Sequence, residues 1–149
     1  MAAPYSQEEE YYQQILSDAF VPYSVLSGAS ALIDRIRQGV TRSMLEAFAD
    51  SNALNRQEVA ALLHISERTI QRLSGTDTLA PLPSDRFLQL LRVFAKGRAV
   101  FDSPAVFLQW LQSPSSALGG ATPYSLLDTS VGIDEVYAVL HRLEQGVYS

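Results

Sequence analysis

The chain has 149 residues, of which 47% are hydrophobic and 18% charged, and its mean hydropathy of +0.03 excludes wholesale intrinsic disorder. It contains no cysteine, which excludes disulfides, zinc thiolates and cysteine nucleophiles, and its two histidines are too far apart in sequence to predict a metal site. No apolar run approaches the ~20 residues that cross a bilayer, and the first ten residues do not have the pattern of a secretory signal. We therefore expect a cytoplasmic protein of bacterial type, without a membrane partner, a bound metal or a cofactor.

The net charge of −5 is unevenly distributed along the chain. Residues 1–34 hold five acids and no base, residues 35–98 hold ten bases and six acids, and residues 99–149 hold five acids and one base. A basic centre between acidic ends predicts different partners for different regions. A solvated helical surface with uneven charge is the alternative.

Helical signals run along the chain, and no convincing period-two alternation appears, so the predicted fold is all-α. An acidic first helix is expected from Ser6, which forms a capping box with Glu9, to a stop near Pro22. Its apolar face carries Tyr12, Ile15, Leu16, Ala19 and Phe20. This helix is expected to form a dimerisation element, to fold back on the body, or to bind another partner. A second helix is expected between Ser30 and Gly39.

Further helices are predicted from their N-terminal caps. Thr41, Asn55 and Ser66 each precede a short apolar-periodic segment. The segment 74–83 contains two prolines and predicts a boundary, after which Ser84 opens another helix. Ser103 and Thr122 are each followed by proline, a typical helix start. A final helix carries Val136, Val139, Leu140 and Leu143 and ends at Gly146.

The segment 55–73 has the pattern of two helices that cross at a tight turn. Ala60 is small enough for a close crossing, and apolar residues are spaced for the buried faces: Val59, Leu63, Ile65, Ile70 and Leu73. The turn position, usually glycine, is occupied by His64, a residue type that tolerates positive φ better than most.

Polar side chains are expected to point outward near the start of the second of these helices. Arginine, glutamine and threonine can read base edges or contact phosphates, whereas Glu67 would repel phosphates. These residues resemble the helix-turn-helix of the Xre/Cro repressor group, and the resemblance implies a homodimer that binds promoter DNA. The candidate DNA-binding residues are Arg56, Ser66, Glu67, Arg68, Thr69, Gln71 and Arg72. A helical scaffold that does not contact DNA is the alternative.

The C-terminal third combines an ALGG turn (117–120), the sequence TPYSLLDT (122–129) and a terminal GVYS (146–149). The Gly119-Gly120 pair permits a sharp reversal with positive φ. This order of features resembles the toxin-binding domain of the Xre/MbcA/ParS-type antitoxins, and the two resemblances together cover roughly residues 32–149. The predicted domains are an acidic N-terminal helix and linker (1–30), a helix-turn-helix domain (31–80) and a toxin-binding domain (81–149).

The resemblance implies an antitoxin that represses its own operon. It also implies that this antitoxin binds a RES-type toxin in a higher assembly. Toxins of this type are enzymes that consume NAD or transfer a group from it. A pocket that accepts NAD phosphates should be basic, so an acidic segment with a terminal carboxylate complements it, and Tyr148 offers an aromatic anchor. The candidate toxin-binding residues are Arg142, Glu144, Gln145, Gly146, Val147, Tyr148 and Ser149. A frayed terminus is the alternative.

Two other function classes compete with the antitoxin hypothesis. A stand-alone helix-turn-helix regulator, whose C-terminal domain binds an effector or oligomerises, is the second hypothesis, and a neighbouring toxin gene would argue against it. An enzyme is not expected, because no nucleophile–base pair, metal-ligand cluster or phosphate loop can be assembled from the sequence.

Overall fold

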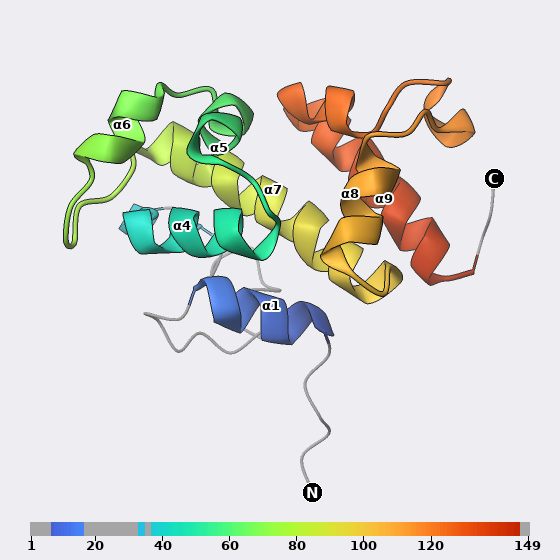
Figure 1. Ribbon diagram of the computed structural model, residues 1–149, viewed down its shortest axis with the longest axis horizontal. Helices are drawn as coiled ribbons and strands as arrows, with labels where there is room; N and C mark the ends of the chain where they lie inside the picture. The colour runs from blue at the N-terminus through green and yellow to red at the C-terminus, as the bar shows by residue number, and fades with distance from the viewer. Residues whose placement is uncertain (1–6, 17–32, 35–36, 147–149) are drawn as a thin grey trace, which may run out of the picture. The chain divides into compact units, whose positions relative to one another are not determined.

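The computed structural model describes residues 7–16, 33–34 and 37–146, and within them all regular structure is helical (Figure 1). The predicted all-α fold is therefore confirmed. The α-helices are α1 (Gln7–Ile15), α4 (Arg42–Ser51), α5 (Arg56–Leu63), α6 (Glu67–Arg72), α7 (Pro81–Val100), α8 (Pro104–Leu111) and α9 (Ser130–Glu144). Two short 3-10 helices, η1 (Ser116–Leu118) and η2 (Tyr124–Asp128), precede α9. None of the described helices is long and apolar enough to span a membrane.

The chain divides into two compact units, Glu9–Leu88 and Met1–Glu8 with Gln89–Ser149. We call them the 9–88 unit and the 89–149 unit. The division falls within α7, which contributes Phe87 and Leu88 to the first core and Leu90 and Leu91 to the second, all of them buried. Of the predicted boundary 74–83, residues 74–80 form the loop and turn that joins α6 to α7, whereas residues 81–83 already belong to α7.

The helix after this loop begins at Pro81, three residues before the predicted start at Ser84. Pro81 and Pro83 both lie in its first turn, where a missing N–H leaves no helical hydrogen bond unmade. Ser84 therefore has another role. Its hydroxyl accepts a hydrogen bond from the Val40 backbone N–H (3.2 Å) and donates one to the Leu79 carbonyl (3.1 Å).

In the 9–88 unit the predicted caps are confirmed. Thr41 accepts from the Met44 N–H and opens α4, and Asn55 forms a complete capping box with Glu58 at the start of α5. The α4 residues that the sequence places on the apolar face (Met44, Leu45 and Phe48) are all buried. Phe48 packs edge-on against Phe87, with ring centroids 5.4 Å apart, so this core includes the first half of α7.

The N-terminal helix differs from its prediction in one residue of its apolar face. Ile15 and Leu16 are buried as expected, but Tyr11 is buried in place of Tyr12. Burial of Tyr11 is favourable because its hydroxyl accepts a hydrogen bond from the Asn52 side-chain amide (2.6 Å). The helix ends at Ile15, before the predicted stop near Pro22, and Leu16 follows it in a turn. The expected cap Ser6 lies outside the described residues, as do Ala19, Phe20 and Pro22. The second expected helix is described only at residues 33–34 and 37–38, which are helical, and is followed by Gly39 with φ +85°.

In the 89–149 unit, Ser103 caps α8 as predicted, and Phe107 of α8 packs edge-on against Phe94 of α7 at 5.4 Å. The helix expected after Thr122 is a 3-10 helix, although the Thr122 hydroxyl still accepts from the Ser125 N–H. Gly119 and Gly120 both have positive φ, as the ALGG turn predicts. Trp110 is half-buried and its ring stacks on that of Phe107, with centroids 6.1 Å apart.

The close contact between η2 and α9 depends on Gly132. A Cβ atom at this position would collide with the Leu126 carbonyl oxygen, and a backbone atom cannot rotate away. We expect Gly132→Ala to lower the free energy of unfolding by about 1–3 kcal/mol, although alanine is normally the better helix former. Urea denaturation measures the change. Val131→Ala is the control, because Val131 is 73% exposed in the same turn. Equal stability of the two variants would contradict this packing.

Candidate functional site

A left-handed residue turns the chain between α5 and α6. His64 has φ +57° and ψ +38° and forms the C-terminal cap of α5. The Ile65 N–H donates back to the Ala60 carbonyl (3.1 Å), which closes the turn and satisfies the end of α5. Ala60 is 4% exposed, in agreement with a close crossing of the two helices.

The facing sides of this corner are apolar, as the sequence pattern predicts. Val59 and Leu63 of α5 and Ile70 of α6 are buried, as is Leu73 directly after α6, while Ile65 in the turn is half-buried. A helix of six residues is too short to be stable alone. Its position therefore depends on these contacts and on its polar end groups.

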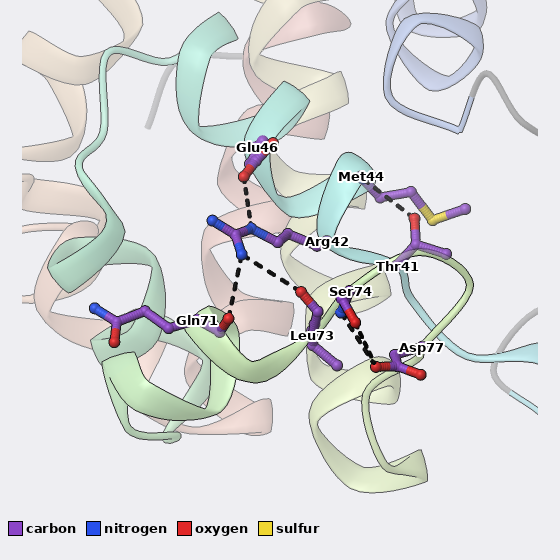
Figure 2. Close-up of polar contacts among 8 residues, drawn as sticks. All are labelled: Thr41, Arg42, Met44, Glu46, Gln71, Leu73, Ser74 and Asp77. Carbon is purple, nitrogen blue, oxygen red and sulfur yellow. Dashed lines mark hydrogen bonds and ion pairs between the residues drawn. The ribbon is translucent and has the colours of Figure 1, made fainter.

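Arg42 of α4 holds the C-terminal end of α6 (Figure 2). Its Nη1 donates to the Gln71 carbonyl (3.2 Å) and to the Leu73 carbonyl (3.4 Å), while its Nε pairs with Glu46 (2.8 Å). A cation at the last carbonyls of a helix satisfies orphan acceptors and complements the helix dipole. This role of Arg42 is not predictable from the sequence, because 29 residues separate Arg42 from Gln71 and no local pattern connects them.

Six of the seven candidate DNA-binding residues are exposed. Ser66, Glu67, Arg68, Thr69, Gln71 and Arg72 are all exposed, whereas Arg56 at the start of α5 is half-buried. Ser66 and Thr69 are partly engaged in the N-terminal cap, since their hydroxyls lie 2.8 Å apart and the Ser66 hydroxyl accepts from the Thr69 N–H. Glu67 lies in the first turn of α6, where a negative charge interacts favourably with the helix dipole. Arg68 and Arg72 are one turn apart, so they share a face with Gln71 beside it.

The candidate toxin-binding residues lie at the end of α9. Arg142, Gln145 and Gly146 are exposed, and Gly146 has φ +77°, in agreement with a helix that ends there. Glu144 has a partner within the 89–149 unit and is not a free surface carboxylate. Val147, Tyr148 and Ser149 lie outside the described residues.

Glu144 belongs to a three-residue ion cluster around Lys96 of α7. The Lys96 ammonium lies 2.8 Å from the Glu144 carboxylate and 2.7 Å from that of Glu8, and its side chain is only 7% exposed. Burial by itself would lower the pKa of Lys96, but the hydrogen bonds to Glu144 and Glu8 outweigh it and raise the pKa above its usual value. The cluster fixes the last turn of α9, from which the C-terminal segment departs.

Within the described ranges no group of three or more histidine, aspartate or glutamate side chains is arranged to hold a metal ion.

Removal of Lys96, the cation that pairs with Glu8 and Glu144, should destabilise the fold. Lys96→Met leaves the buried carboxylate of Glu8 and the partly exposed one of Glu144 without their counter-ion, and we expect the free energy of unfolding to fall by about 2–4 kcal/mol. The pKa of Lys96 is raised above its ordinary value of 10.5, so its contribution to stability is fully present below pH 10.5 and is lost as pH rises through the raised pKa. The difference from the unmodified protein should therefore be the same at pH 6 and pH 9, as measured by urea denaturation.

The control is the triple variant Lys96→Met, Glu8→Gln, Glu144→Gln, which contains no buried charge at this place and should regain part of the lost stability. A single variant as stable as the unmodified chain would show that the cluster contributes nothing.

Comparison with known proteins agrees with this arrangement. Residues 31–92 match the antitoxin Xre-like helix-turn-helix domain, and residues 96–146 match the antitoxin Xre/MbcA/ParS C-terminal toxin-binding domain. A protein called Antitoxin Xre from Yersinia enterocolitica is 27% identical over 83% of this chain and 84% of its own length. Another of the same name, from Photorhabdus laumondii, is 24% identical over 76% of this chain and 78% of its own length. With a helix-turn-helix domain followed by a toxin-binding domain over most of its length, the chain belongs to the Xre-type antitoxins of toxin–antitoxin systems.

Proposed function

We propose that this antitoxin neutralises a RES-type, NAD-consuming toxin by occluding the toxin's active site, and that it represses its own operon by binding promoter DNA. It acts in the cytoplasm by binding alone, without a catalytic step of its own. The exposed polar face of α6, presented by a buried left-handed corner, is the observation that carries the DNA-binding part.

The physical support for DNA binding lies in what α6 leaves exposed. Its apolar residue Ile70 is 2% exposed, while Arg68, Gln71 and Arg72 face solvent. Arginine contacts both phosphates and guanine edges, and glutamine contacts adenine edges. Ten of the eleven basic residues of the chain lie in residues 35–98, so the helix is part of the basic region. We therefore assign α6 to the major groove.

The support for toxin binding lies at the other end of the chain. Residues 99–149 carry five acids and one base, and a pocket that holds NAD phosphates is expected to be basic. Such complementarity accelerates and orients association. The Lys96 cluster holds the end of α9 in place, so the following residues, Gln145–Ser149, leave from a fixed point. We assign these residues, together with Arg142, to the neutralising surface.

The proposal includes a homodimer, because helix-turn-helix proteins read two half-sites related by a two-fold axis.

The DNA-binding part is tested by replacing the two arginines of α6. Arg68→Ala with Arg72→Ala removes two cations from the exposed face without touching a buried residue. We expect at least about a tenfold loss of affinity for a promoter fragment, and a decrease of about 2 in the slope of log affinity against log salt. Fluorescence anisotropy over a salt series measures both.

Arg142→Ala is the matched control, since this arginine is exposed on α9 and is not assigned to DNA. Unchanged affinity and salt slope in the α6 variant would mean that α6 does not face DNA.

The toxin-binding part is tested by co-expression with the neighbouring gene in the operon. The full-length chain should rescue growth and co-purify with the gene product. Deletion of Gly146–Ser149 should abolish rescue, because the segment assigned to the toxin's active site is missing, while binding to the promoter fragment remains. Rescue by the truncated chain at equal expression would eliminate the tail mechanism and leave other surfaces of the C-terminal domain to account for neutralisation.

A further inference from the structure

An exposed apolar patch lies in the 9–88 unit, and none of its residues belongs to α6. Leu82, in the first turn of α7, is 83% exposed, and Ile33 is 46% exposed. Together with Pro81 they line a shallow hollow of about 330 Å³, and Arg37 and Asp85 complete its lining. We call these five residues the Leu82 patch.

The exposed apolar side chains of the patch, Leu82 and Ile33, do not contribute to the core of the 9–88 unit. Leu82 lies one turn before the buried core residues of α7, and Pro81 beside it is exposed as well. Exposed leucines are common singly, but a hollow bordered by leucine, isoleucine and proline side chains is typical of a surface that is covered in an assembly.

The charges at the patch indicate which partner covers it. Arg37 follows Ile33 by four residues in sequence, and Asp85 lies one helical turn beyond Leu82 in α7, so both charges line the hollow together with the apolar side chains. Among the residues that the structure describes, neither Arg37 nor Asp85 forms an ion pair. A partner of strong single-sign charge, such as nucleic acid, would be attracted by one of these residues and repelled by the other.

A second copy of the same surface satisfies both charges. In a two-fold interface, residue i of one protomer contacts residue j of its partner, and j contacts i. A surface that carries one cation, Arg37, and one anion, Asp85, beside apolar side chains has both of the charges that such pairing requires. Arg37 of each copy can pair with the partner's Asp85, while the two Leu82 side chains bury one another.

We propose that the Leu82 patch is the surface through which two copies of this chain form the homodimer. This inference locates the dimer that the proposed function requires, and it rests on that part of the proposal. The patch and α6 belong to the same compact unit, so pairing through it joins two DNA-binding units to one another.

The experiment is sedimentation equilibrium on the full-length chain over a concentration series, with charge-reversal variants. Leu82→Glu should weaken dimerisation by at least about tenfold, because two carboxylates replace the apolar centre. Arg37→Glu and Asp85→Arg should each weaken it as well, because each places like charges across the interface. The double variant Arg37→Glu, Asp85→Arg restores opposite charges and should return the dissociation constant to within about threefold of the original.

Val131→Glu is the control, since Val131 is 73% exposed in the 89–149 unit and should leave dimerisation unchanged. Thermal unfolding of every variant tests whether the chain still folds. If Leu82→Glu lowers stability of the protomer while the dimer persists, a segment of the same chain covers the patch, and the proposal is overturned.

Other outcomes separate this inference from the proposed function. Dimers in every variant would overturn the Leu82 patch and leave the homodimer in place. A monomeric unmodified chain would overturn both the patch and the homodimer, but not toxin neutralisation, which the co-expression test measures separately. A double variant that is no better than the single variants would exclude the Arg37–Asp85 pairing and with it the two-fold arrangement.

Discussion

The position of α6 depends on the left-handed turn at His64. The left-handed backbone conformation of His64 ends α5 and reverses the direction of the chain before α6. The small side chain of Ala60, which is buried, allows α5 and α6 to pack closely. A larger residue at position 60, or a β-branched residue at position 64, would change the crossing before any polar residue of α6 was affected. The same turn brings Ile70 into the core and leaves Arg68 and Arg72 in solvent, so the exposed face is a consequence of the buried one.

The short helix also needs support at both ends. Ser66 satisfies the N-terminal donors and Arg42 satisfies the C-terminal acceptors. Each contact is individually modest in free energy, but together they fix the helix in two directions that packing of Ile70 alone would leave free. The 89–149 unit uses a related device, since Lys96 fixes the end of α9 by pairing with Glu144 and Glu8. In both units a buried or half-buried cation fixes the helix end that adjoins a candidate binding surface.

The sequence predicted the features that depend on local chemistry. Caps at Thr41, Asn55, Ser66 and Ser103 follow from the reach of a side-chain oxygen to an amide two or three residues away, and all four are present. It did not predict the contact of Arg42 with the end of α6 or the Lys96 cluster, because the residues that these contacts join lie 29 to 88 positions apart in sequence. It also placed the start of α7 too late, because it treated prolines as helix breakers in a position where they are compatible with the first turn.

The exposed face of α6 is small, and this has a consequence for recognition. Apart from Glu67, whose charge repels phosphates, three polar side chains of α6 are exposed and lie outside the Ser66–Thr69 cap: Arg68, Gln71 and Arg72. Good base contacts discriminate by about 1–3 kcal/mol each, so one copy of this helix discriminates weakly against the many competing sites of a genome. Two copies held at a fixed spacing multiply that discrimination, provided that their relative orientation is set by a well-packed interface. The specificity of the antitoxin for its promoter is therefore determined as much by the surface that joins the two copies as by the residues that touch the bases.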